Sequence, residues 1–210
     1  MSDICIGKMV LSVCATNCYY IYKNGCNKVV FIDPGDRGEY IYSELKSKGF
    51  EVDTILLTHG HFDHIWGAEE LRKLSGAKIF ALDKEEELLS NSDMNVSKMA
   101  GREYVLRADG YFKDGDILQI LGFDIKVLAT PGHTAGSCCF YFENEKVLIS
   151  GDTLFEESVG RTDFPTGSGS TLAKSIKDKL SVLPDDVSVY PGHGDYTSIG
   201  HEKDYNPFWN

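Results

Sequence analysis

The sequence is poor in basic residues relative to acidic ones. Its 210 residues include 21 Lys and Arg but 32 Asp and Glu, so the formal net charge at pH 7 is −11. Proteins that bind nucleic acids use clustered Lys and Arg to contact phosphates, and this sequence has no such cluster. The composition therefore argues against a nucleic-acid partner and is typical of a protein with a solvated acidic surface.

Apolar runs of membrane-spanning length are also missing, and residues 1–5 do not begin a basic region followed by a long apolar one. We therefore expect a cytoplasmic protein that binds no membrane. Since 42% of the residues are hydrophobic and 25% are charged, the chain can bury one sizeable core. We expect residues 1–210 to form a single domain, and the sequence leaves the oligomeric state open.

Cys-x-x-Cys pairs are absent as well, although the chain has six cysteines. This absence favours cytosolic thiols, while disulfides stay open at the level of sequence. Cys138 and Cys139 lie in an apolar stretch that reads as a strand, where small buried thiols are common. We interpret both as core residues rather than catalytic nucleophiles.

The sequence does contain a dense group of histidines in residues 58–64, which read Thr-His-Gly-His-Phe-Asp-His. The preceding residues 52–58 have the character of a buried strand, and Gly60 allows a sharp turn where that strand ends. We therefore expect His59, His61, Asp63 and His64 on a loop at the C-terminal end of the strand. So dense a group of imidazoles with a carboxylate predicts a metal site.

Apolar periodicity predicts two β-rich halves with helices between and after the strands. Residues 91–115 show no clear period, so they are the first candidate for a flexible or substrate-facing insertion. Strands are expected at residues 4–13, 19–22, 28–33, 52–58, 78–81, 116–121, 123–129, 137–142, 146–150 and 187–190, and helices at residues 39–48, 67–74, 83–90 and around Leu172, Ile176 and Leu180.

Three more candidate ligands follow predicted strands in the second half. His133 and His193 each end a Pro-Gly-His turn, which delivers the imidazole at the edge of a strand, and Asp152 follows the strand at 146–150. A lone histidine after a strand is more often structural, and a lone Asp152 would be read as a turn residue or helix cap. Beside the first group, the five histidines and two aspartates predict a two-metal site. His201 lies in a polar segment, and we expect it to be solvated.

The motif His59-x-His61-x-Asp63-His64, followed by His133, Asp152 and His193, resembles the metallo-β-lactamase fold superfamily. Three stretches are similar to the glyoxalase II (hydroxyacylglutathione hydrolase) group within it: Gly-Arg-Thr-Asp-Phe-Pro at 160–165, Pro-Gly-His-Gly at 191–194 and Asn-Pro-Phe at 206–208. The resemblance spans almost the whole chain. It implies an α/β fold, a four-layer αβ/βα sandwich with two sheets face to face and the metals at one edge between the halves.

The resemblance also implies a division of the ligands. His59, His61 and His133 would hold one divalent metal, Asp63, His64 and His193 the other, and Asp152 would bridge the two. Nitrogen and oxygen ligands without thiolates favour zinc, and iron or manganese are chemically acceptable.

Two such ions lower the pKa of a shared water from about 15.7 toward neutrality and so supply a metal-bound hydroxide as nucleophile. They can also polarise the substrate carbonyl and stabilise the oxyanion that forms from it. Asp63 is both a ligand and a candidate proton acceptor, and Asp152 is the second residue that we place in catalysis.

The expected reaction is hydrolysis of a small-molecule thioester such as a hydroxyacyl-thiol conjugate. Arg161 is a candidate for binding a substrate carboxylate, although a salt bridge to Asp163 is the simpler interpretation. Phe155 and Phe164 are candidates for lining the pocket, where aromatic residues more often serve packing. Glyoxalase II enzymes have a further C-terminal helical region that grips glutathione, and here about 17 residues follow His193. The resemblance therefore does not by itself predict glutathione as the thiol.

Two other functions are compatible with the same motifs. Persulfide dioxygenases resemble this chain too, including the Gly-Arg-Thr-Asp-Phe loop, and in such an enzyme His59, His133 and Asp152 would hold a single iron. A non-catalytic, metal-stabilised binding domain is the third interpretation. β-Lactam and nucleic-acid hydrolysis are compatible with the fold, and the acidic charge and the expected location argue against both.

Overall fold

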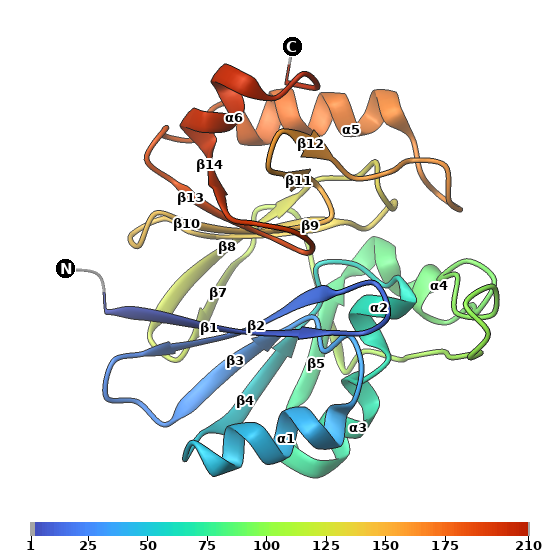
Figure 1. Cartoon of the computed structure of the whole chain (residues 1–210), viewed down its shortest axis with the longest axis vertical. Helices are drawn as coiled ribbons and strands as arrows, with labels where there is room; N and C mark the ends of the chain where they lie inside the picture. Colours follow the sequence, from blue (N-terminus) through green and yellow to red (C-terminus); the bar gives the residue numbers. More distant parts are fainter. Residues whose placement is uncertain (1–2, 210) are drawn as a thin grey trace.

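The computed structural model describes residues 3–209, and this part of the chain forms two six-stranded sheets packed face to face with helices on both outer faces (Figure 1). Three layers of buried apolar side chains lie between the four layers of secondary structure. The predicted four-layer α/β sandwich is confirmed.

The first sheet follows chain order from β1 to β6. Its first three strands are antiparallel, and β3 to β6 are parallel, which requires crossover segments such as the helices α1 (Gly38–Ser47) and α3 (Ala68–Ser75). The strands are β1 (Ile4–Leu11), β2 (Thr16–Lys23), β3 (Lys28–Ile32), β4 (Glu51–Leu56), β5 (Lys78–Leu82) and β6 (Gly110–Phe112).

Alternate residues of β3 show why this sheet lies in the interior. Val29 and Phe31 pack toward α1 and α3, whereas Val30 and Ile32 pack toward the second sheet. Successive side chains of a strand point to opposite faces, and a strand covered on both faces therefore needs a continuous apolar run. The Val-Val-Phe-Ile sequence supplies it.

The second sheet has the order β14-β13-β10-β9-β8-β7. Leu172, Ile176 and Leu180 are buried against its outer face, which confirms the predicted apolar helix face. The strands are β7 (Ile117–Ile120), β8 (Phe123–Ala129), β9 (Cys138–Phe142), β10 (Val147–Gly151), β13 (Ser188–Pro191) and β14 (Thr197–Ser198), and the covering helices are α5 (Gly169–Ser175), the π-helical η2 (Ile176–Leu180) and α6 (Ile199–Tyr205).

Cys138 and Cys139 are fully buried in β9, as predicted. All six cysteines lie within the described residues, and all are free. No helix of residues 3–209 is long and apolar enough to cross a membrane. The remaining short elements are α2 (Phe62–Ile65), η1 (Asp83–Glu85), α4 (Glu86–Leu89), β11 (Leu154–Phe155) and β12 (Ser158–Val159).

Candidate metal centre

All seven predicted ligands come together where β4, β8, β10 and β13 end. His59 and His61 follow β4 on a loop, as expected. Asp63 and His64 do not lie on this loop, because the chain turns into α2 directly after His61. The expectation of one loop for the whole cluster was therefore wrong in its second half, and a single helical turn places these two side chains.

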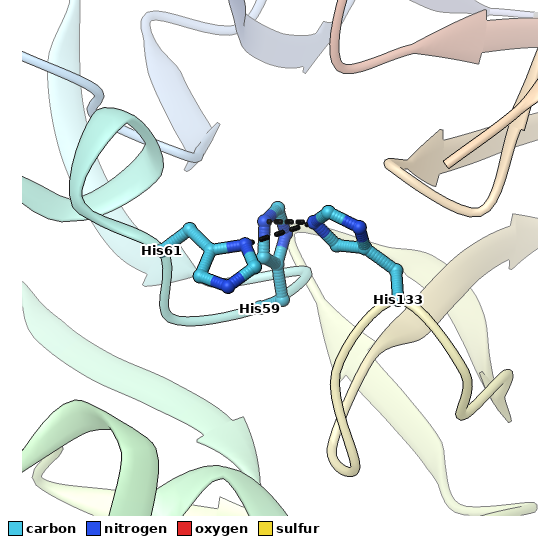
Figure 2. Close-up of side chains that lie close together, drawn as sticks. All are labelled: His59, His61 and His133. Atoms are coloured by element: carbon cyan, nitrogen blue, oxygen red, sulfur yellow. Dashed lines mark hydrogen bonds between the residues drawn. The ribbon is translucent and has the colours of Figure 1, made fainter. Parts of the chain in front are cut away.

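One group consists of three buried histidines from both halves of the molecule (Figure 2). The Nε2 atom of His133 lies 3.2 Å from Nε2 of His59 and 2.9 Å from Nδ1 of His61. His61 thus presents its Nδ1 atom to the group, whereas the other two histidines present Nε2. The three nitrogens converge from a loop after β4 and a turn after β8.

The second group consists of Asp63, His64 and His193. The Oδ2 atom of Asp63 lies 3.3 Å from Nε2 of His193 and 3.6 Å from Nε2 of His64. The Nε2 atoms of His64 and His193 are 3.3 Å apart. This group also combines residues that follow β4 with one that follows a strand of the second sheet.

The carboxylate of Asp152 reaches both groups. Its Oδ2 atom lies 3.6 Å from Nε2 of His133 and 3.4 Å from Nε2 of His193. Its Oδ1 atom lies 3.3 Å from Nε2 of His64, and among the described residues it has no hydrogen-bond donor of suitable geometry. Asp152 therefore stands between the two groups, as a bridging ligand would.

Carbonyl groups behind two of the imidazoles fix which ring nitrogen faces the centre. Nδ1 of His133 lies 2.8 Å from the carbonyl oxygen of Arg161, and Nδ1 of His193 lies 3.1 Å from that of Cys14. A carbonyl oxygen can only accept, so each Nδ1 carries the hydrogen. In the neutral ring the lone pair of Nε2 then points inward.

Asp33, the last residue of the strand expected at residues 28–33, has the same effect on two other ligands. Its carboxylate accepts hydrogen bonds from the backbone N–H of Thr58 at 2.8 Å, from the hydroxyl of Thr58 at 2.6 Å and from Nδ1 of His64 at 2.9 Å. Because the Thr58 hydroxyl donates to Asp33, it accepts from Nδ1 of His59, 3.1 Å away. The signal in the sequence was only an aspartate at the end of an apolar strand.

The three histidines of the first group are uncharged at neutral pH. Burial lowers the pKa of His59 and of His133, and it lowers the pKa of His61 to about 3. An uncharged imidazole with an inward lone pair is the form that binds a metal ion.

In the second group, nearby carboxylates determine the direction of the pKa shifts of both histidines. Burial lowers the pKa of His64, but neighbouring carboxylates, that of Asp152 first, outweigh burial and raise it well above its usual value. Hydrogen bonds to Asp152 and Asp63 likewise outweigh burial at His193 and raise its pKa to about 9. The aspartates thus create a strongly negative potential where the two groups meet.

These observations fit a pair of divalent cations. Facing ring nitrogens from five histidines lie 2.9–3.3 Å apart, and the carboxylates of Asp63 and Asp152 lie beside them, so several donors would bind a cation placed between them. The donors are nitrogen and carboxylate oxygen without a thiolate, which suits zinc, iron or manganese.

The two Pro-Gly-His turns need glycine for different reasons. Gly132 has a φ of +138°, and a Cβ atom there would lie 2.4 Å from the backbone of Leu172. A Cβ atom at Gly192 would lie 2.2 Å from Oδ1 of Asp152 and 2.8 Å from Cε1 of His64. The first glycine lets the turn pack against α5, and the second leaves room for the carboxylate between the two groups.

The candidate substrate residues lie on either side of the centre. The ring of Phe164 is 5.7 Å from that of His61, and the ring of Phe155 is 6.1 Å from that of His193. Arg161 is exposed and makes a bidentate salt bridge with Asp163, with both N···O distances 2.7 Å, and its guanidinium lies 3.7 Å from the centre of the Phe164 ring. The simpler interpretation of Arg161 is therefore confirmed for its contacts in this structure.

Residues 91–115 consist mostly of turns and irregular segments and include the short strand β6, and the part around Val96 lies against this side of the centre. Val96 packs in a small cluster with Phe62 and Trp66, and Phe164 contacts the same cluster. The backbone N–H of Phe62 donates to the carbonyl of Asn95 at 3.0 Å. The segment therefore supports the start of α2, where Asp63 and His64 lie.

The family of the chain follows from its comparison with known proteins. Residues 11–193 match the family model of the metallo-beta-lactamase superfamily. The chain belongs to the metallo-beta-lactamase superfamily. Its cluster of histidines and aspartates is a metal-binding cluster of this superfamily, and the chain is a metallo-hydrolase of the same superfamily.

Two curated relatives of this superfamily cover nearly the whole chain. A probable metallo-hydrolase of Streptococcus pyogenes serotype M6 is 36% identical over 211 aligned positions, and the match covers 98% of this chain and 90% of the relative. The hydroxyacylglutathione hydrolase GloC of Haemophilus influenzae is 37% identical over 200 aligned positions, and the match covers 92% of each chain.

Two solved structures with the metallo-beta-lactamase fold are similar over almost their full length. BLEG-1, described as a B3 metallo-beta-lactamase, has a TM-score of 0.93 and 36% identity, covering 98% of this chain and 100% of its own. TTHA1623 in a di-iron-bound form has a TM-score of 0.84 and 31% identity, covering 96% of this chain and 99% of its own.

Proposed function

We propose that this protein is a dinuclear metal hydrolase that cleaves a small-molecule thioester. His59, His61 and His133 hold one metal, Asp63, His64 and His193 hold the other, and Asp152 binds both. The observation that carries the proposal is the position of Asp152, whose carboxylate lies 3.6 Å from His133 of the first group and 3.4 Å from His193 of the second. A single-metal site would not need a carboxylate shared between two complete groups.

Two bound divalent ions supply an activated water at neutral pH and polarise a carbonyl group. The protein contributes the fixed positions of the ligands, because hydrogen bonds from behind orient four of the five imidazoles, those of His59, His64, His133 and His193. Asp63 accepts a hydrogen bond from Thr16 at 2.8 Å and lies 3.3 Å from His193, so its carboxylate is held in place and is the candidate proton acceptor. Asp152 keeps the two ligand groups together.

A thioester substrate is supported by the relative GloC, a hydroxyacylglutathione hydrolase with 37% identity to this chain. Phe164 and Phe155 border the centre on opposite sides and offer apolar walls for the acyl and thiol parts. Arg161, beside Phe164, can bind a substrate carboxylate if it exchanges Asp163 for the substrate. The whole arrangement suits a small molecule, and action on such a substrate in the cytoplasm, without nucleic acid or membrane, belongs to this proposal.

The choice of zinc also belongs to the proposal. The nitrogen and oxygen donor set suits zinc, but TTHA1623 was solved in a di-iron-bound form. Metal analysis of protein purified without added metal decides the identity. We expect about two ions per chain, in keeping with a two-metal site.

The first test of the proposal is hydrolysis of S-lactoylglutathione and of a panel of other thioesters by the metal-loaded protein. Asp152→Ala should lower kcat/KM by more than about 100-fold, since the loss of a direct ligand exceeds the 10–100-fold effect of an outer partner. Asp178→Ala, which removes an exposed carboxylate paired with Lys174, should retain full activity. A metal-loaded protein that is inert on every thioester would refute the substrate class, and full activity of Asp152→Ala would refute the bridging role.

β-Lactam hydrolysis is the second candidate, because BLEG-1 is 36% identical and is described as a B3 metallo-beta-lactamase. The same preparation should be tested on penicillin, cephalosporin and carbapenem substrates, and a kcat/KM for any of these above that for every thioester would favour this candidate. Oxygen uptake with glutathione persulfide, with one iron per chain, would instead indicate the dioxygenase. If the protein binds metal but turns over none of these substrates, the binding-domain interpretation gains support.

A further inference from the structure

Glu85 is a buried carboxylate outside both ligand groups. It is the last residue of η1, the short helix that directly follows β5. Its exposed fraction is 0%, whereas the neighbouring Glu86 and Glu87 are exposed. The groups that hydrogen-bond to it are uncharged. Burying a carboxylate away from water and without a cation costs free energy. A buried carboxylate therefore needs hydrogen-bond donors at its oxygen atoms.

Those oxygen atoms connect two loops. Oε1 of Glu85 accepts a hydrogen bond from the backbone N–H of Gly60 at 2.8 Å, and the hydroxyl of Thr134 donates to Oε1 at 2.9 Å and to Oε2 at 3.1 Å. Gly60 stands between His59 and His61, and Thr134 directly follows His133. The carboxylate thus contacts a neighbour of every histidine in the first group.

The second loop folds closely around the carboxylate. Gly136 lies directly against the carboxylate, since a Cβ atom there would lie 2.3 Å from Oε2 of Glu85. The hydroxyl of Thr134 is in turn 2.7 Å from that of Ser137, which closes the turn. The distance between the two loops is therefore set by one side chain.

We propose that Glu85 is a positioning residue for the metal held by His59, His61 and His133, because it joins the two loops that carry them. The inference rests on the proposed division of the ligands. The other metal has separate supports: Thr16 donates to Asp63, Asp33 accepts from His64, and the carbonyl of Cys14 accepts from His193. Loss of Glu85 should therefore weaken one metal site and spare the other.

The test is a titration of metal-free protein with Zn²⁺ by calorimetry, and with Co²⁺ followed by its visible absorption. His193→Ala leaves one complete group, that of His59, and His59→Ala leaves only the other. We expect Glu85→Ala to lower metal affinity 10–100-fold in the His193→Ala background and less than about threefold in the His59→Ala background.

Two further variants keep the test valid if Glu85→Ala folds poorly. Thr134→Val removes the hydroxyl that donates to Glu85 with little change of shape. It should lower the metal affinity of the same site at least about fivefold. Glu85→Gln should restore most of the affinity, because its amide oxygen can accept from Gly60 while its N–H group donates to the Thr134 hydroxyl.

Glu202 provides the matched control, because it is equally buried but lies on α6. Its carboxylate accepts hydrogen bonds from the backbone N–H of Glu157 and from the side-chain amide of Asn206. Glu202→Ala should lower stability and leave both metal affinities unchanged. Equal weakening of both sites by Glu85→Ala, no weakening at all by it and Thr134→Val, or the same effect from Glu202→Ala would overturn the inference. Metal affinity is measured without a substrate, so a failed thioesterase assay would leave this result intact.

Discussion

At the scale of single residues, Asp33 has the widest effect on the centre. Through direct and Thr58-mediated hydrogen bonds it orients His64 of one ligand group and His59 of the other. Asp33→Asn replaces one acceptor oxygen with an N–H donor, so at least one of the groups of Thr58 and His64 that donate to Asp33 loses its acceptor. We predict that metal titration of this variant shows a 10–100-fold loss of affinity at both sites.

Thr58→Val distinguishes the effect of Asp33 on His59, which passes through the Thr58 hydroxyl, from its direct effect on His64. It removes the hydroxyl between Asp33 and His59 but leaves the contact with His64. Only the metal bound by His59 should therefore be weakened. Equal affinities in the wild type and Asp33→Asn would show that other contacts orient both imidazoles.

Glu85 gives stability a pH dependence that can be measured in the metal-free protein. Burial raises its pKa from 4.5 to about 7. A carboxyl group whose pKa is higher in the folded state contributes stability below pH 4.5, and this contribution is lost as the pH rises through about 7. Between these limits the loss amounts to about 3 kcal/mol.

Glu85→Gln cannot titrate, so the loss should be absent from that variant. We predict that the free energy of unfolding of the wild type, measured with denaturant and compared with that of Glu85→Gln, falls by about 3 kcal/mol between pH 4.5 and pH 8. Each protein carries the same histidines, so their contributions cancel in the difference. Parallel curves for the two proteins would show that the folded state does not perturb Glu85.

The ligands could be predicted from sequence but their supports could not, for a physical reason. A metal ligand is revealed by a rare residue type at a short spacing, as in residues 58–64. Glu85 lies in the acidic run Asp-Lys-Glu-Glu-Glu of residues 83–87, and nothing local distinguishes the buried carboxylate from the exposed ones. Asp33 and Glu85 each act on a partner 25 residues away in the chain, and only the fold brings them together.

At the scale of elements, the long strands and helices were predicted because the spacing of apolar residues repeats several times along each of them. The short ones, α2, β6, β11, β12 and β14, contain two to four residues, too few to show a period. The helix α6 was missed because its buried positions include the charged Glu202, and His201 on it is half-buried and lies 3.1 Å from Glu157. The expected solvation of His201 holds only in part.

The two Pro-Gly-His turns predict different consequences of the same substitution. Gly132→Ala forces an alanine to a φ of +138° against the backbone of Leu172, which should lower the free energy of unfolding by about 1–3 kcal/mol or more. Gly192→Ala has no such φ but would displace Asp152, so its main effect should be loss of bound metal. Thermal unfolding without metal and metal content on loading distinguish the two. Equal losses in both assays would contradict the separate roles.

At the scale of the whole molecule, each ligand group joins the two halves of the sandwich. His59, Asp63 and His64 follow β4 of the first sheet, whereas His133 and His193 follow β8 and β13 of the second. The buried cluster between the sheets holds the halves together without metal. Bound metal should therefore add stability to a structure that is already folded, rather than create the fold.

The size of this effect can be estimated from binding. A ligand present at 1,000 times its Kd adds about 4 kcal/mol to the stability of the state that binds it. For a protein of this length, 1 kcal/mol changes the Tm by about 2–4 °C, so a chelator should lower the Tm by about 10 °C. Added Zn²⁺ should restore the original value, and Asp152→Asn should show a much smaller shift because its amide binds metal poorly. An unchanged Tm after complete metal removal would mean that the metals do not connect the halves, because ions held by both sheets must be released before the sheets can separate.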